Sequence, residues 1–337
     1  MKERIRWIDV FKGICILMVV IHHAPFNVSK DYPIWGFDWI NAVIMGFFMP
    51  AFFVITGYCG NFSSPCIPFL WRNVKTIIIP SYCLYYFNHW IEDARCFFFY
   101  DADWITWHHF FSPCIRTFIQ EGGYYWFLSA LFLSKMLYYV INRLLKKLVS
   151  KILLSLFLLS FGVICANIDT SHNYFYWQQA MILTLYLPLG VFLKEHEDII
   201  KSKGWMSLLL YVALVSILVL MGKNVPSVNR TIDVPVLMIP MHLILSLTGT
   251  LAVWWLSETI GKSLLLEYLG RNTIIIYAFN FSVLALVSAC LFTIFEPQNA
   301  LVFNLMFWVM IIVSIIILSF LAWLLNAKYV RCVLGKF

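Results

Sequence analysis

The chain has 337 residues, of which 62% are hydrophobic and 12% are charged. A soluble domain carries about 25% charged residues, so this composition excludes an ordinary soluble protein. The formal net charge of +7 is distributed over connecting segments rather than gathered on one basic face, which argues against nucleic-acid binding. We expect an all-α, polytopic membrane protein that forms one transmembrane domain over residues 1–337.

The first apolar segment has charges at one end and two imidazoles at the other. Asp9 and Lys12 precede the apolar run 14–21, and His22 and His23 follow it. The run is preceded by basic residues, as in a signal peptide, but the residues after it form a poor cleavage site. We therefore interpret the segment as a retained membrane helix.

Helical geometry separates the two histidines of this segment. Lys12 and His23 lie about 20° apart on a helical wheel, Asp9 lies about 40° from His23, and His22 points about 100° away. Ionisable groups at membrane depth usually face a bundle interior or a wet cavity, which favours His23 as a general base. Asp9 lies about 21 Å from His23 along the helix, so we assign it to Lys12 or Arg6. The alternative is an interfacial Asp9–Lys12 pair, with both histidines at the opposite headgroups.

Apolar runs of membrane-spanning length predict ten helices. Most Lys and Arg residues fall in alternate connections, which places the N- and C-termini in the cytoplasm. The predicted spans are 8–25, 39–58, 74–91, 124–142, 151–167, 175–193, 204–221, 236–256, 272–293 and 301–326.

Segment 91–123 is the longest predicted outer connection, and its aromatic residues alternate with acids and histidines. Such a mixture is typical of an aromatic belt at the membrane interface, and it also suits sugar binding by stacking and hydrogen bonding. Cys96 and Cys114 lie in this segment, and the sequence leaves open whether they pair. The cysteines show no metal-type spacing, and we expect most of them to be small apolar packing residues.

The motif Asp9-x-x-Lys12-Gly13, followed by an apolar run and His23, resembles the opening of the acyltransferase-3 family of membrane O-acyltransferases. In that family a basic residue precedes a catalytic histidine by ten intervening residues, and a lysine in this place is similar to the sugar O-acetylase branch. Further stretches resemble family elements in the expected order: Met49-Pro50 with Thr56-Gly57-Tyr58, Arg72 to Tyr82, Trp126-Phe127-Leu128, Pro188-Leu189-Gly190, and Leu269-Gly270-Arg271-Asn272 with Tyr277.

The resemblance implies transfer of an acetyl or other acyl group from cytoplasmic acyl-CoA to a sugar hydroxyl of a cell-surface, exported or lipid-linked glycan. It places the protein in the inner or plasma membrane, in contact with membrane lipids, with no permanently bound cofactor and no metal. His23 would be the general base, by direct transfer or through an acyl-enzyme. The residues expected to bind substrate are Asp9, Lys12, Arg72, Lys75, Tyr82, Trp126 and Asn272.

Arg72 and Lys75 also support a donor site independently of the resemblance. They lie three residues apart on the predicted cytoplasmic side, where a diphosphate would favour two cations. The alternative is that they only obey the positive-inside rule. Gln178, Gln179 and His242 are other intramembrane polar residues, which we expect to form interhelical hydrogen bonds.

Three positions depart from the family pattern. Phe48 precedes Met-Pro where many relatives have His, Asn280 stands where a His often follows Tyr277, and Lys12 replaces the commoner Arg. Loss of two polar contacts keeps an inactive relative as an alternative. A transporter or flippase for lipid-linked glycans is another, although we find no paired halves of the kind common in transporters. The glycan, the hydroxyl, the acyl length and the oligomeric state are not specified by the sequence.

Overall fold

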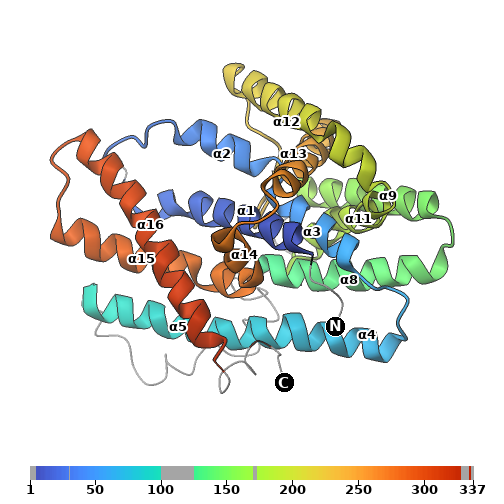
Figure 1. Cartoon of the computed structure of the whole chain (residues 1–337), viewed down its shortest axis with the longest axis horizontal. Helices are drawn as coiled ribbons and strands as arrows, with labels where there is room; N and C mark the ends of the chain where they lie inside the picture. Colours follow the sequence, from blue (N-terminus) through green and yellow to red (C-terminus); the bar gives the residue numbers. More distant parts are fainter. Residues whose placement is uncertain (1–4, 30, 100–124, 170–172, 328–333, 335–337) are drawn as a thin grey trace.

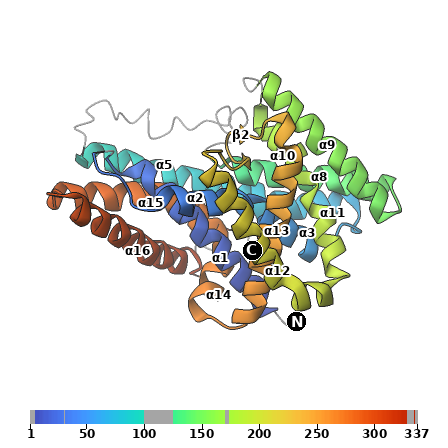
Figure 2. The same cartoon turned by 90° about the horizontal axis from the view of Figure 1, so that it is seen from above.

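The computed structural model describes residues 5–29, 31–99, 125–169, 173–327 and 334, which form a helical bundle with one short two-stranded ribbon (Figures 1 and 2). The first elements are α1 (Arg6–His23), η1 (Ala24–Asn27), α2 (Phe37–Met45), α3 (Phe48–Cys59), α4 (Cys66–Asn73), η2 (Val74–Ile78), α5 (Ile79–Phe99), α8 (Trp126–Leu144) and α9 (Leu148–Ile168). The remaining elements are η3 (Tyr174–Tyr176), α10 (Trp177–Thr184), α11 (Tyr186–Lys194), α12 (Glu197–Leu220), β1 (Ser227–Val228), β2 (Ile232–Asp233), η4 (Val236–Met238), α13 (Ile239–Ile260), α14 (Leu264–Arg271), α15 (Thr273–Ile294) and α16 (Ala300–Leu325).

The helices confirm a multi-pass α-helical membrane protein. Each predicted span corresponds to helical residues, and seven helical segments of the described chain are long and apolar enough to cross a membrane. These are Arg6–Asn27, Phe37–Cys59, Leu148–Ile168, Ser202–Leu220, Val236–Ile260, Thr273–Ile294 and Ala300–Leu325. The count of ten spans and the cytoplasmic placement of both termini stay predictions.

The predicted spans outside this set lie in α5, α8 and the pair α10–α11. The pair is divided at Leu185, so neither half has the length of a membrane span. Tyr186 and Leu187 at its centre are fully buried by neighbouring helices. A helix that is covered by protein on all sides needs less hydropathy than one that faces lipid.

Helix α5 extends further than the sequence predicted. It ends at Phe99, whereas the predicted span ended at residue 91. Its first turns continue from α4 through η2, a π-helical turn of the kind that frequently occurs at functional sites. The question left open by the sequence, whether Cys96 and Cys114 pair, falls outside the described side chains.

Two glycines allow α1 and α14 to pack backbone to backbone. A Cβ atom on Gly13 of α1 would overlap the carbonyl oxygen of Leu266, and a Cβ atom on Gly270 of α14 would overlap that of Asp9. Each helix therefore needs a glycine where the other helix crosses it. Both glycines belong to motifs that carry the family resemblance.

A second crossing, between α3 and α11, has the same construction. A Cβ atom on Gly57 would overlap the carbonyl oxygen of Leu187, and one on Gly190 would overlap the carbonyl oxygen of Val54. Both contacts are reciprocal and involve backbone atoms, which cannot move aside as a flexible side chain does. The short motifs at these glycines are thus explained by helix packing.

Buried polar side chains attach the connecting segments to the bundle. Gln179 donates hydrogen bonds to the carbonyl oxygens of Asn229 and Arg230, next to the β1–β2 ribbon, at 3.3 and 2.8 Å. His242 Nε2 lies 3.1 Å from the Tyr186 hydroxyl, which confirms the expected interhelical hydrogen bond. These contacts give the buried side chains of Gln179, His242 and Tyr186 partners within the protein, as a lipid environment requires.

Candidate functional site

His23 lies at the C-terminal end of α1 and contacts the middle of α15. Its Nδ1 atom is 2.5 Å from Oδ1 of Asn280. The imidazole is half-buried, and Phe281 meets it edge-on with ring centroids 6.2 Å apart. The helix that carries the predicted base therefore holds its ring against a buried amide.

Asn280 is itself fixed on both sides of its amide group. Its side chain is 2% exposed, and Nδ2 donates to the carbonyl oxygen of Tyr277 at 2.6 Å. The adjacent backbone is held by Tyr125, whose hydroxyl donates to the carbonyl oxygen of Ala278 at 3.0 Å. The position at which the sequence suggested a lost polar contact thus supplies a hydrogen bond to His23.

His22 faces a different part of the bundle, as the helical wheel predicts. Its Nδ1 atom lies 2.8 Å from Oδ1 of Asn41 on α2, and its ring packs 5.6 Å from the ring of Phe48 on α3. The two imidazoles are adjacent, with centroids 5.2 Å apart. Two of the three departures from the family pattern therefore contact the histidine pair, Phe48 at His22 and Asn280 at His23.

Asp9, at the opposite end of α1, has a partner that the sequence did not indicate. We assigned Asp9 to Lys12 or Arg6, but Arg271 of α14 donates from Nε to its carboxylate at 3.1 Å. Arg271 also donates to Glu267 at 2.6 Å, so one guanidinium bridges two buried carboxylates. This ion pair joins α1 to α14 beside the glycine crossing. The sequence did not indicate it, because α14 approaches α1 only in the folded bundle.

Lys12, unlike Asp9, has no ion-pair partner among the described residues. It is half-buried, and within the described part of the chain the structure shows no hydrogen bond or ion pair from it. Cys59 of α3 lies within electrostatic range of both Lys12 and Lys194. Lys194 in turn lies over the ring of Tyr58 at 5.4 Å. Two lysines from α1 and α11 therefore contribute positive potential to the same region.

Arg72 and Lys75 lie on a different group of helices from Lys12. Arg72 is exposed and donates to the carbonyl oxygen of Asn61 at 3.1 Å, and the Lys75 ammonium lies 5.4 Å from the Trp71 ring. Their elements, α4 and η2, pack against α5 and α8, whereas α1 packs mainly against α14, α13 and α15. The structure thus separates the predicted cations into two groups.

The three uncharged candidates occupy separate places. Tyr82 is half-buried on α5, with its ring edge-on to Tyr86. Trp126 is buried at the start of α8. Asn272 lies at the α14–α15 junction, where it donates to the carbonyl oxygen of Tyr268 and accepts from Asn326, at 2.8 and 2.7 Å. Its amide is engaged in holding helix ends together.

The family of the chain is decided by a comparison over nearly its whole length. Residues 5–324 match the acyltransferase-3 family, described as an acyltransferase domain. The chain belongs to this family. Searches of curated proteins and of solved structures gave no match. The protein is therefore a membrane acyltransferase.

As a member of the acyltransferase-3 family, the chain joins distant family motifs in its fold. Gly13 of the first motif contacts the segment that contains Gly270, and the Tyr277 hydroxyl accepts a hydrogen bond from the backbone of Phe127 at 3.3 Å. Gly13 and Gly270 thus join the first motif to the last, and Tyr277 joins the last motif to the one at Phe127. No group of three or more His, Cys, Asp or Glu in metal-binding arrangement occurs among the described residues.

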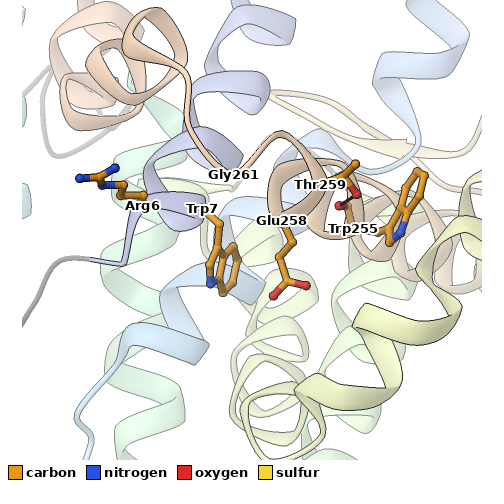
Figure 3. Close-up of a pocket in the computed structure, with 6 residues that line it drawn as sticks. All are labelled: Arg6, Trp7, Trp255, Glu258, Thr259 and Gly261. Carbon is orange, nitrogen blue, oxygen red and sulfur yellow. Dashed lines mark hydrogen bonds between the residues drawn. The ribbon is translucent and has the colours of Figure 1, made fainter.

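A pocket of about 530 Å³ opens beside the N-terminal end of α1, and apart from Arg6 its lining residues were not singled out by the sequence. Figure 3 shows Trp7 and Glu258 lying side by side, with Trp255 beyond Glu258 and Arg6 directed away from it. Thr259 and Gly261 complete the lining. Two indole rings and one carboxylate therefore lie together in the lining, while the Arg6 guanidinium points away from them.

Proposed function

We propose that this acyltransferase moves an acetyl group, or another short acyl group, from cytoplasmic acyl-CoA to a sugar hydroxyl of a cell-surface or exported glycan. The observation that carries the proposal is the His23–Asn280 contact, which holds a half-buried imidazole inside the bundle of an acyltransferase-family chain. His23 acts as the general base, and the sugar O-acetylase branch rests on the resemblance around Lys12.

The reaction balances with one base and no bound cofactor. A ring nitrogen of His23 accepts the proton of the sugar hydroxyl while the hydroxyl oxygen attacks the thioester carbonyl carbon. The C–S bond then breaks, and the CoA sulfur leaves with the proton that His23 returns. The products are a sugar ester and free CoA.

The charges near the N-terminal end of α1 support a donor at that end. Lys12 lies about 16 Å from His23 along the helix, since His23 is eleven positions further along the chain. The donor's phosphates would bind Lys12, with Arg72 and Lys75 as a second group of cations, while the thioester reaches His23. The pocket beside Trp7 and Arg6 opens near the same end of α1, and its aromatic faces suit an adenine ring.

The other proposed substrate-binding residues differ in how exposed their side chains are and in whether the protein already hydrogen-bonds them. Tyr82 is half-buried, whereas Trp126 is buried and Asn272 has its amide hydrogen-bonded within the protein. Asp9 would contribute indirectly, by holding α1 in place, because its carboxylate pairs with Arg271. We keep these four residues as proposed contributors to the substrate cavity.

The test is transfer of radiolabel from acetyl-CoA to the glycan fraction of membranes that contain the full-length protein. Label in an ester is released by mild alkali, which separates O-acetylation from other incorporation. The variant His23→Ala should lose transfer by at least about 100-fold, the contribution expected of a general base. His22→Ala is the matched control, because it removes the adjacent imidazole on another face of α1.

Loss of label in His23→Ala together with retention in His22→Ala would support the proposal. Equal label in all three proteins, at equal amounts in the membrane, would overturn His23 as the base. Absence of transfer by the wild-type protein, with movement of lipid-linked glycan across the vesicle membrane, would favour the transporter alternative.

A further inference from the structure

We propose that Asn280 is a positioning residue that sets the tautomer of His23 and thereby presents Nε2 of His23 as the base. The inference deepens the proposed function and rests on it, because it names the nitrogen that accepts the proton. It assigns a role to the residue that stands where a histidine is usual in the family.

The orientation of the Asn280 amide follows from its two hydrogen bonds. One end of the amide lies 2.6 Å from the carbonyl oxygen of Tyr277, and only the NH₂ group can donate there. The other end, which faces His23 Nδ1 at 2.5 Å, must therefore be the oxygen. The reverse orientation would place two acceptors in contact at Tyr277.

An oxygen acceptor at Nδ1 determines the state of the imidazole. Oδ1 of Asn280 cannot donate, so His23 must carry a hydrogen on Nδ1 for the contact to be a hydrogen bond. In the neutral ring, Nε2 then holds the free lone pair. When Nε2 accepts a proton from the substrate, Nδ1 keeps its bond to Asn280 without rearrangement.

The backbone that carries Asn280 is held in place from two other helices. The Tyr125 hydroxyl, just before α8, donates to the carbonyl oxygens of Ala278 and of Leu84 on α5, at 3.0 and 3.3 Å. The Phe127 backbone N–H of α8 donates to the hydroxyl of Tyr277. Because Asn280 lies only a few residues from these anchors, its amide is presented to His23 with little freedom.

The neighbouring histidine provides an internal comparison. His22 has the same type of contact, from Nδ1 to Oδ1 of Asn41 at 2.8 Å, but toward α2 instead of α15. No second hydrogen bond of Asn41 fixes its amide within the described part of the chain. If the role of Asn280 were only to satisfy a buried imidazole, Asn41→Leu and Asn280→Leu should have similar effects.

The experiment measures kcat and the KM for acetyl-CoA in membranes that contain the full-length wild-type protein, Asn280→Leu, Asn280→His or Asn41→Leu. Leucine has the same branched skeleton as asparagine and no acceptor, so kcat of Asn280→Leu should fall about 10-fold or more, with KM for acetyl-CoA changed less than about twofold. Asn280→His keeps an acceptor nitrogen and should retain kcat within about threefold. Asn41→Leu should leave both constants near the wild-type values.

A second measurement, ¹⁵N NMR of histidine-labelled protein in lipid, reads the tautomer without any reaction. The His23 signals are identified by their absence in His23→Gln. We expect the hydrogen on Nδ1 in the wild type and a changed tautomer ratio in Asn280→Leu. A hydrogen on Nε2 in the wild type, or equal kcat in all variants of an active enzyme, would overturn the inference. An inactive wild type would overturn the proposed function, while the NMR result would still decide the role of Asn280.

Discussion

Arg271 is the residue on which the charge balance at the N-terminal end of α1 depends. Its guanidinium bonds to Asp9 and Glu267, whose side chains are 5% and 7% exposed, while its own side chain is 44% exposed. Two buried carboxylates beside one cation are tolerable only while the cation is present. The pair therefore fixes α14 against α1, and it leaves Lys12 without a carboxylate partner from this cluster.

We predict that Arg271→Leu destabilises the protein more than Asp9→Asn does. The first change removes the guanidinium from two buried carboxylates, and the partial exposure of Arg271 reduces the expected cost to about 1–3 kcal/mol. The second change replaces a charge by a neutral amide and leaves the Arg271–Glu267 pair intact. Thermal unfolding of the detergent-solubilised variants measures both effects.

The double variant Arg271→Leu with Asp9→Asn serves as the control for this pair. It removes the charge of Asp9, one of the two buried carboxylates that Arg271 contacts in the wild type, so its unfolding midpoint should lie above that of Arg271→Leu alone. A midpoint equal to the wild-type value in Arg271→Leu would show that the pair contributes nothing to stability.

The two histidines show how far the sequence reaches at the scale of single residues. The helical wheel separated His22 from His23 correctly, because side-chain direction along a helix follows from the backbone repeat. Their partners, Asn41 and Asn280, were not foreseen as such. Asn280 is 257 residues from His23 in the chain, and no local pattern connects them.

At the scale of elements, glycine pairs decide where helices cross. Gly13 with Gly270 joins α1 to α14, and Gly57 with Gly190 joins α3 to α11. In both pairs, each glycine faces the backbone of the opposite helix, which a Cβ atom would displace. An alanine would normally favour a helix over glycine by about 1 kcal/mol, so the conformational cost of glycine is accepted for close approach.

We predict that Gly13→Ala and Gly270→Ala each lower stability by about 1–3 kcal/mol, the range for forced overpacking. The double variant should cost less than the sum of the two, because the first alanine already separates the helices. The free energies of unfolding of the single and double variants measure this coupling.

The combination Gly13→Ala with Gly57→Ala is the matched control, since these glycines belong to different crossings. Their effects should add within about 0.5 kcal/mol. Additive effects in the Gly13–Gly270 pair as well would contradict a shared crossing.

The sequence did not predict where helices are interrupted. The predicted span 39–58 is divided at Gly46 and Phe47, between α2 and α3, and the span 175–193 is divided at Leu185. Hydropathy measures the length of an apolar run and is insensitive to an interruption inside it.

For the whole molecule, the distribution of Lys and Arg predicts which connections face the cytoplasm. The α3–α4 connection, with exposed Cys59 and Cys66, belongs to the predicted inner side. The segment with exposed Lys223, after α12, belongs to the predicted outer side. These two connections therefore test both the orientation and the even number of spans.

We predict that a membrane-impermeant maleimide labels Cys59 and Cys66 only in inside-out vesicles, because the predicted orientation places both on the cytoplasmic side. A cysteine introduced by Lys223→Cys should be labelled in intact cells. The experiment uses a background with Cys96→Ser and Cys114→Ser, which removes the cysteines of the predicted outer loop. Loss of signal in Cys59→Ser with Cys66→Ser identifies the labelled sites, and labelling of Cys66 in intact cells would reverse the predicted orientation.

The sequence by itself determined the class of the molecule and the approximate positions of its helices. Both depend on local quantities, since the hydropathy of a run and its length decide whether it crosses a membrane. It also placed His23 on the same face of α1 as Asp9 and Lys12, and it led to the family through motifs in the correct order. The substrate, the donor contacts and the general base stay predictions.

The tertiary structure decided which distant residues meet. Asp9 pairs with Arg271 across 262 residues of sequence, and His23 contacts Asn280 at the position where the family pattern suggested a missing polar group. These pairs arise because α14 and α15 pack beside α1, an arrangement fixed by glycine crossings and buried hydrogen bonds from the whole bundle. A local pattern records which face of a helix is polar, but only the packed bundle supplies the group that this face contacts.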